Sequence, residues 1–192
     1  MTHTVEVAGE RLSFKKAVIA TGARAAAPPI DGLDTVDYLT NETVFSLTEL
    51  PKRLAVVVAG PIGCDMAQPF ARFGSEVLLV EATHGILPRE DTDASGIVLE
   101  SMLKDRVNHL CCGKALKLAK TDGDKIRLTV ESHGKNYDDV VDRLLVAVGR
   151  APNIENLGLA DANVAYTRKG VQVSNRLQTT IAGIYAAVIA TT

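Results

Sequence analysis

The sequence is poor in cysteine and in aromatic residues, and it has no tryptophan. Its 192 residues include three cysteines, and aromatic residues make up 4% of the chain. Because three is an odd number, these cysteines cannot all pair in the disulfide framework that holds small secreted domains together. The cysteine content therefore indicates a reducing compartment, and we expect a cytoplasmic protein.

The sequence also lacks a long apolar run. No stretch approaches the roughly 18 consecutive apolar residues that a membrane-spanning helix needs. The beginning of the sequence, Met-Thr-His-Thr-Val-Glu, carries neither the basic nor the apolar region of a secretory signal. We therefore expect no membrane as a partner.

Neither sign of charge is in large excess. The net charge is −2 at pH 7, and the isoelectric point calculated from the sequence is about 6.1. Such a balance does not attract nucleic acid or an anionic membrane, so we expect neither as a partner. With 46% hydrophobic residues the chain can bury a core, and its length fits one large domain or two small ones.

The histidines follow no ligand spacing. His3, His84, His109 and His133 share no motif with one another or with a cysteine. No Ser-His-Asp order is present either. The sequence thus predicts no metal site and no hydrolase chemistry, and our interpretation of these histidines is surface or loop positions.

The most informative stretch covers residues 54–81. Residues 54–58 are a run of five apolar residues typical of a strand buried on both faces, and a small-residue turn follows. Apolar residues at helical spacing then predict a helix that ends at Gly74, and residues 77–80 predict a second strand closed by Glu81. This order of strand, glycine turn, helix, strand and acid is typical of a dinucleotide-binding unit.

The glycine fingerprint of this unit is incomplete. Gly60 and Gly63 occupy the second and third positions of G-x-G-x-x-G, but Val58 stands at the first, where a bulky residue suits a tight turn poorly. Glu81 follows Gly63 by 18 residues, close to the offset of a ribose contact. We predict that a nucleotide contacts Gly60, Pro61, Ile62, Gly63 and Glu81. The alternative is a βαβ unit whose glycines only permit close packing of the helix on the strand.

Weaker patterns fill the rest of the chain. Alternation predicts a hairpin over residues 4–14, and apolar runs predict buried strands at 17–20 and 144–148. Residues 97–106 have helical spacing after an acidic cluster, and strands are expected at 107–111, 115–119 and 126–132, with a turn at 121–124 between the last two. Short strands are expected near 164–166 and 171–173.

Four segments together resemble a known family. They are residues 17–29, 54–65, 144–153 and 183–187, and in this order they resemble the pyridine nucleotide–disulfide oxidoreductases, most closely the mercuric reductases, with dihydrolipoamide dehydrogenases as the alternative. The resemblance implies an α/β fold. A Rossmann-like βαβ nicotinamide-nucleotide-binding domain with a small β-meander would cover residues 46–153, flanked by partial pieces of an FAD-binding domain at 1–45 and 154–192.

The resemblance also implies cofactors and a reaction. Members of the family use NAD(P)H and FAD, and pass a hydride from nicotinamide to flavin and on to a cysteine pair spaced C-x-x-x-x-C. Cys64, Cys111 and Cys112 do not have that spacing, so the pair is expected before residue 1. We accordingly expect an internal fragment that by itself is inactive and retains no flavin, from a parent enzyme that forms a homodimer through a domain absent here.

Further site residues follow from the resemblance alone. Asp65 stands where the family has a glutamate near the nicotinamide ring, although an acid in the first turn of a helix is also favoured by the helix dipole. Gly149 and Arg150 match a Gly-Arg-x-Pro-Asn signature where the two dinucleotide domains meet. Thr21 and Gly22 match a second contact region of the flavin domain. Simple turns are the alternative for both pairs.

The cysteines invite a metal-binding interpretation, which the strand pattern argues against. Adjacent residues of a strand point to opposite faces, so we expect the sulfurs of Cys111 and Cys112 not to chelate an ion but to be packed or half-exposed thiols. Cys64 is placed to have its pKa lowered by the helix N-terminus, although packing against the strand is the preferred interpretation.

Three departures from the family pattern leave a second function open. They are Val58 in place of glycine, Pro69 inside the predicted helix, and Val188-Ile189 where the family has Gly-Asp. A non-catalytic nucleotide-binding module is therefore the alternative to a reductase. For the cofactor, Glu81 predicts NAD(H) over NADP(H), because a carboxylate accepts from the ribose 2′-hydroxyl and repels a 2′-phosphate.

Overall fold

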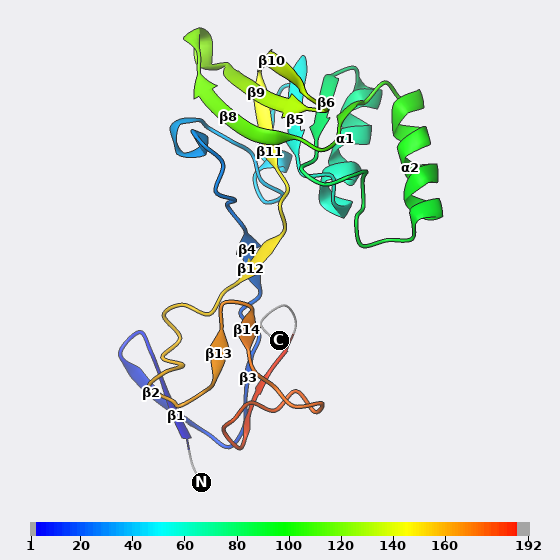
Figure 1. Ribbon diagram of the computed structural model, residues 1–192. Helices are drawn as coiled ribbons and strands as arrows, with labels where there is room; N and C mark the ends of the chain where they lie inside the picture. The colour runs from blue at the N-terminus through cyan, green and yellow to red at the C-terminus, as the bar shows by residue number, and fades with distance from the viewer. Residues whose placement is uncertain (1–2, 188–192) are drawn as a thin grey trace. The chain divides into compact units, whose positions relative to one another are not determined.

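The computed structural model describes residues 3–187 and divides into two compact units (Figure 1). The central unit is Ala25–Gly149, and the flanking unit comprises the described parts of Met1–Arg24 and Arg150–Thr192. Residues 25–45, which the sequence groups with the flanking segments, lie in the central unit. In the described part of the chain no helix is long and apolar enough to cross a membrane.

A four-stranded parallel sheet forms the middle of the central unit. Its order is β11-β5-β6-β7, with bounds Arg143–Val146, Arg53–Val57, Glu76–Val80 and Asn108–Leu110. Leu54, Ala55 and Val56 are all fully buried, which shows that successive residues of β5 are covered on both faces of the sheet. The predicted strands at 54–58, 77–80, 107–111 and 144–148 are therefore confirmed, with shifts of up to two residues at their ends.

Two helices cover one face of this sheet (Figure 1). Helix α1 (Pro61–Phe73) packs its small residues Cys64 and Ala67 on strand residues such as Val56, which brings its axis close to the sheet. Helix α2 (Thr92–Lys104) contributes Met102 to the same core. It begins five residues earlier than its apolar spacing predicts, because the Asp91 side chain accepts from the Asp93 N–H and caps it.

An antiparallel meander covers the other face. It consists of β8 (Lys114–Lys120), β9 (Ile126–Ser132) and β10 (Lys135–Val141), and its order is β10-β9-β8. Leu118, Leu128 and Val130 of the meander join a core with Val57 and Val146 of the sheet. Strand β10 was not predicted, because its first five residues are polar or exposed and include two aspartates.

Helix α1 has the predicted C-terminal cap, and one of its apolar residues is unexpectedly exposed. Gly74 adopts φ 108°, and its N–H donates to the Ala71 carbonyl, which is a left-handed C-terminal cap. Pro69 lies inside the helix as predicted. Phe73, which continues the apolar spacing in the sequence, is 70% exposed and takes no part in the core.

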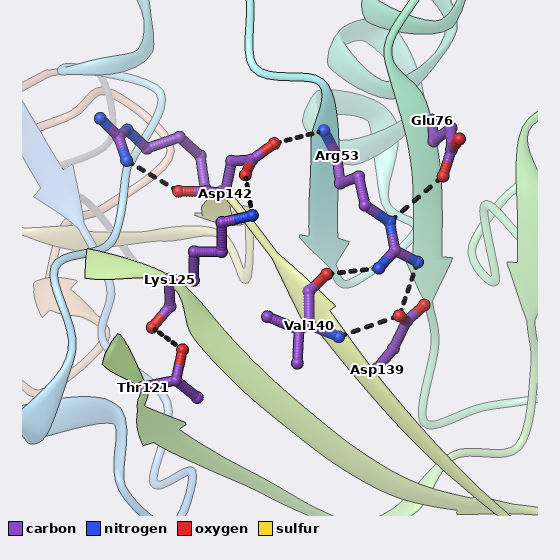
Figure 2. A network of polar contacts seen from close by, with 8 residues as sticks. Arg53, Glu76, Thr121, Lys125, Asp139, Val140 and Asp142 are labelled. Carbon is purple, nitrogen blue, oxygen red and sulfur yellow. Dashed lines mark hydrogen bonds and ion pairs between the residues drawn. The ribbon is translucent and has the colours of Figure 1, made fainter. Parts of the chain in front are cut away.

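A polar network ties the meander to the amino end of the sheet. Figure 2 shows the Arg53 guanidinium, which donates to Glu76 at 3.1 Å, to Asp139 at 2.6 Å and to the Val140 carbonyl at 2.6 Å. The Arg53 N–H donates to Asp142 at 2.8 Å. Partial burial opposes ionisation of Asp142, but this bond and nearby cations outweigh burial and lower its pKa. The network holds β10 beside β5, and so fixes where the meander packs on the sheet.

The flanking unit is built from strand pairs. They are β1 (His3–Val7) with β2 (Glu10–Phe14), β3 (Ala17–Ile19) with β15 (Ile184–Ala186), β4 (Ala23–Ala25) with β12 (Arg150–Pro152), and β13 (Tyr166–Thr167) with β14 (Gly170–Val171). The predicted hairpin is confirmed. The strand predicted at 17–20 is present as β3, but it is not buried, since Val18 is 61% exposed. The short strands expected near 164–166 and 171–173 are present with shifts of up to two residues. Three 3₁₀ helices lie in the central unit, at Leu33–Thr35, Val44–Ser46 and Asp122–Asp124. Val188-Ile189 lies outside the described residues.

Candidate functional site

A cavity of about 450 Å³ lies where β5 and β11 end and α1 begins. Its wall comes from the turn before α1, the loop after β6 and the residues that follow β11. The lining residues are Val58, Gly60, Pro61, Ile62, Glu81, Thr83, Leu87, Pro88, Arg89, Glu90, Ala147, Val148 and Gly149. The carboxyl end of a parallel sheet is where ligands bind in open α/β folds, so this cavity is the candidate site.

The turn between β5 and α1 is tight and strained. Val58 adopts φ 80°, a left-handed conformation that is costly for a β-branched residue. A Cβ atom on Gly63 would lie 2.0 Å from the Val58 carbonyl oxygen, so only glycine fits there. A Cβ on Gly60 would meet no atom within 4 Å, so packing within the protein does not explain that glycine. Gly63 thus serves close packing, while Gly60 leaves space in the cavity wall.

The beginning of α1 offers backbone donors to the cavity. Gly60 is the N-cap residue and no side chain caps the helix, although the first N–H groups of any helix lack acceptors within it. Pro61 occupies the first helical position, where its missing N–H costs nothing. An anionic group in the cavity would therefore meet free N–H groups and the positive end of the helix dipole.

Glu81 is buried at the end of β6, with 3% of its surface exposed. One carboxylate oxygen accepts from the Ala59 N–H at 2.7 Å, and the other accepts from the Thr83 N–H at 3.0 Å. The carboxylate therefore fastens the end of β5 to the loop after β6. A carboxylate has about four acceptor positions, so these two bonds leave capacity for a ligand hydroxyl.

The loop after β6 contributes lining residues that the sequence analysis missed. The Leu87 N–H donates to the Ala59 carbonyl at 2.8 Å, which closes this loop over the turn. Arg89 is a cation in the cavity wall, and Glu90 lies next to it. The only sign in the sequence that these residues line the site is their position, because this loop directly follows the strand that ends at Glu81.

Two predicted contact residues of α1, Gly63 and Asp65, are not part of the cavity wall, and neither is Cys64. Asp65 is exposed and does not line the cavity. Cys64 is buried, and its thiol donates to the Ala59 carbonyl at 3.4 Å. Burial, together with Asp65 and Glu81, raises the pKa of Cys64 to about 11. The helix dipole therefore does not lower the pKa of Cys64, as the sequence had suggested it could, because burial disfavours the thiolate more strongly than the dipole favours it.

A second cluster, in the flanking unit, joins two segments that are far apart in sequence. The Thr21 hydroxyl donates to the Asn153 carbonyl at 2.6 Å, and the Asn153 side chain donates back to the Thr21 carbonyl at 3.0 Å. The Gly22 carbonyl accepts from the Asn153 N–H at 3.0 Å, and the Arg150 guanidinium donates to the Ala23 carbonyl at 2.7 Å. The structure therefore brings the predicted Thr-Gly and Gly-Arg-x-Pro-Asn segments together, at β4 and β12.

An ion pair missed in the sequence completes this second cluster. The Arg24 guanidinium donates to both oxygens of Glu155, at 2.9 and 2.8 Å. The bonds from Arg24 lower the pKa of Glu155 to about 2. Both side chains are exposed and lie 131 residues apart in the sequence, so no local pattern could reveal the pair.

The expectation that Cys111 and Cys112 are half-exposed thiols is confirmed, but the strand geometry assumed for them is wrong. Strand β7 ends at Leu110, so Cys111 and Cys112 lie beyond it, and Cys112 has φ 57°. The alternation of a strand therefore does not apply, and both sulfurs lie on one side. With the ring of His84 they offer ligand atoms within 4.8 Å of one another, and His133 Nε2 lies 3.1 Å from Cys111 Sγ.

Comparison with solved structures places this α/β arrangement in a class. The chain is similar to the HOCl-induced flavoprotein disulfide reductase RclA from Escherichia coli, with a TM-score of 0.82, 31% sequence identity, and coverage of 96% of this chain and 42% of that chain. The fold of this chain is therefore like that of the flavoprotein disulfide reductases.

The family profile described as pyridine nucleotide-disulphide oxidoreductase matches residues 1–187. The chain belongs to this family, which confirms the resemblance of the four segments.

Two curated relatives define the similarity more closely. A mercuric reductase of Bacillus cereus is 36% identical over 186 residues, which cover 96% of this chain and 29% of the relative. A dihydrolipoyl dehydrogenase of Thermus scotoductus is 34% identical over 186 residues, which cover 95% of this chain and 40% of the relative. The chain thus spans between 29% and 40% of the length of these relatives.

Proposed function

We propose that the central unit binds a nicotinamide nucleotide within a flavin-dependent reductase. The observation that carries this proposal is the cavity wall, which combines Gly60, Pro61, Ile62, Glu81 and Gly149 of the predicted set. The start of α1 suits the pyrophosphate, because free N–H groups and the helix dipole favour an anion. The apolar part of the wall suits a flat ring. These residues fit the cofactor, and a bound nicotinamide supplies the hydride.

Gly63 supports the binding of the pyrophosphate indirectly. Its missing side chain lets α1 approach the Val58 carbonyl, since a Cβ there would lie 2.0 Å from that oxygen. The helix start therefore lies against the end of β5. Asp65 is exposed and lies beyond the first turn of α1, where the helix dipole favours an acid only weakly. Its contact with the nicotinamide end of the cofactor remains part of the proposal.

The proposed cofactor is NADH. Glu81 keeps about two acceptor positions free, and its charge repels a 2′-phosphate. Arg89 favours the opposite choice, because a guanidinium in the same wall can pair with that phosphate. We give Glu81 more weight, because it is held by two backbone bonds whereas no hydrogen bond or ion pair of the described residues fixes Arg89.

Titration with both nucleotides tests the proposal. The full chain should bind NADH more tightly than NADPH, and Gly60→Ala should weaken both without lowering the thermal midpoint, because the new methyl enters the cavity and not the protein. Arg89→Ala should leave NADH binding unchanged and weaken NADPH binding. Tighter NADPH binding by the unchanged chain would reverse the cofactor assignment. Absence of binding of either nucleotide would overturn the proposal and would equally rule out the non-catalytic nucleotide-binding module.

The electron acceptor and the flavin belong to the proposal for the whole protein. We propose a mercuric reductase-like enzyme, with a dihydrolipoamide dehydrogenase-like one as the alternative, that forms a homodimer through a part outside this chain. The cluster of Thr21, Gly22, Arg150 and Asn153 would border the flavin. These groups already satisfy one another, so we expect the 192-residue chain to purify without flavin and to be inactive. A yellow preparation that oxidises NADH with mercuric ion or a disulfide would contradict this.

A further inference from the structure

Two cysteines and two histidines lie together beside the carboxyl end of the parallel sheet, outside the cavity wall. Cys111 and Cys112 follow β7, His84 lies in the loop after β6, and His133 lies in the turn between β9 and β10. His84 Nδ1 is 3.0 Å from Cys112 Sγ, and His133 Nε2 is 3.1 Å from Cys111 Sγ. Neither histidine nor either cysteine of this group has a part in the proposed nucleotide site.

Backbone bonds hold these side chains in place. The Cys112 N–H donates to the Thr83 carbonyl at 3.0 Å, which fixes the second cysteine beside the residue before His84. The Ser132 hydroxyl donates to the Cys111 carbonyl at 2.6 Å, which fixes the first cysteine beside the residue before His133. The left-handed φ of 57° at Cys112 turns the chain between the two sulfurs. The grouping therefore results from two separate loop contacts and not from free side-chain motion.

We propose that His84, Cys111 and Cys112 bind one thiophilic metal ion, such as Zn²⁺ or Cu⁺, with His133 available as a fourth ligand. Their ligand atoms lie within 4.8 Å of one another. In a tetrahedral zinc site with bonds of about 2.0–2.3 Å, ligand atoms are about 3.3–3.8 Å apart, so small side-chain rotations complete the geometry. Because the donors are sulfur and imidazole nitrogen, hard ions such as Mg²⁺ and Ca²⁺ are poor candidates.

Binding exchanges protons for the metal. Each thiol gives its proton to solvent as its sulfur–metal bond forms, and the imidazoles bind as neutral rings. No electron is transferred in this step. His84 is exposed and both cysteines are half-buried, so an ion from solvent reaches the ligands directly.

Zinc titration of the full chain, reduced and freed of metal, tests the proposal. In competition with a chromophoric chelator, the chain should bind one Zn²⁺, and Co²⁺ should give a sulfur-to-cobalt charge-transfer band. Cys111→Ser and Cys112→Ser should each weaken zinc binding at least about 10- to 100-fold, the loss typical of removing even an outer partner of a metal ligand. His84→Gln should weaken it as well, and His133→Gln decides between three and four protein ligands.

Matched controls come from the same chain. Cys64→Ser alters a buried thiol that is bonded to the Ala59 carbonyl, and His3→Gln alters a ring stacked on Phe14 in the flanking unit. Both should bind zinc like the unchanged chain, and thermal melts check that every variant folds. No zinc at one-to-one ratio, no charge-transfer band, or an equal loss in Cys64→Ser would overturn the proposal. A Cys111–Cys112 disulfide that persists under reducing conditions would do so too.

Discussion

The central and flanking units differ in how much of their apolar surface they bury. In the central unit, two clusters of twelve buried residues each lie on the two faces of one sheet. In the flanking unit, the described residues form one cluster of five. Its β1–β2 hairpin leaves Val5, Val7 and Leu12 between 45% and 56% exposed.

This difference in burial indicates which unit can keep the candidate sites in a fixed geometry. Burial of apolar surface is the main favourable term in folding, so a sheet covered on both faces can stabilise itself, while isolated strand pairs cannot. The cavity and the group of cysteines and histidines both lie in the central unit. Their geometry should therefore survive changes in the flanking unit.

The largest expected difference between the two units is in their stability: the central unit should fold without the flanking unit. A shortened chain of residues 25–149 should fold cooperatively with the thermal midpoint of the central unit nearly unchanged. In the full chain, amides of β5, β6 and β11 should exchange hydrogen several orders of magnitude more slowly than those of β1 and β2. Equal exchange in both units, or a shortened chain that does not fold, would contradict the comparison.

Gly63→Ala should unfold or strongly weaken the central unit alone. The added methyl would lie 2.0 Å from the Val58 carbonyl oxygen, and backbone cannot move aside as a flexible side chain can. We expect a loss of about 3 kcal/mol or more of unfolding free energy. Gly60→Ala is the matched control and should melt like the unchanged chain. A mild effect of Gly63→Ala would mean that helix and strand separate easily, and the central unit would be less rigid than we infer.

Pro69→Ala should stabilise the central unit. Proline inside α1 removes the hydrogen bond to the Asp65 carbonyl, and alanine restores the donor. The gain should be up to about 3 kcal/mol, the difference between the two residues in a helix interior. Thermal melting measures it, and an unchanged or lower midpoint would show that α1 is locally adapted to proline.

Val58→Gly should be more stable than Val58→Ala. Both variants remove the valine packing, but only alanine keeps a Cβ at the left-handed φ of 80°. The expected difference is about 1 kcal/mol in favour of glycine, whereas at ordinary strand positions glycine is the less stable by about 0.5–1 kcal/mol. Chemical denaturation of the two variants measures it. A more stable alanine variant would mean that the turn relaxes, and the strain in this unit would then be absent.

The smallest expected effect is a dependence of the central unit on pH. Burial lowers the pKa of His109 from 6.5, with Glu81 opposing the shift, and its buried Nε2 has no partner among the described residues. The unfolded chain binds this proton more readily, so the stability that neutral His109 confers is full above about 6.5 and falls as pH falls through the lower folded pKa. Denaturant unfolding at several pH values measures this, and His109→Gln should flatten the slope.

Much of the fold could be predicted because its signals are local. Apolar runs mark β5, β6 and β11, and Gly74 ends α1 where the spacing places it. Strand β10 could not be predicted, since its stability comes from pairing with β9 and from Asp139 bonding to Arg53, and not from its own residues.

The candidate sites likewise could be predicted where their residues are close in the sequence and could not where they are distant. Gly60 and Glu81 belong to one short motif, and the structure places both in the cavity wall. The contact between Thr21 and Asn153 spans 132 residues, so residue patterns gave no sign that the two segments meet. The grouping of the cysteines and histidines was not predicted, because the argument from alternation assumes a strand conformation that Cys112 does not have.

The close approach of α1 to Val58 also bears on how such units are recognised. A fingerprint that counts glycines gives each position equal weight, although here the first position holds valine, the second faces open space, and the third alone is closed to every side chain. A search that weights each glycine by the backbone it contacts would therefore detect diverged βαβ units that a search by glycine number overlooks.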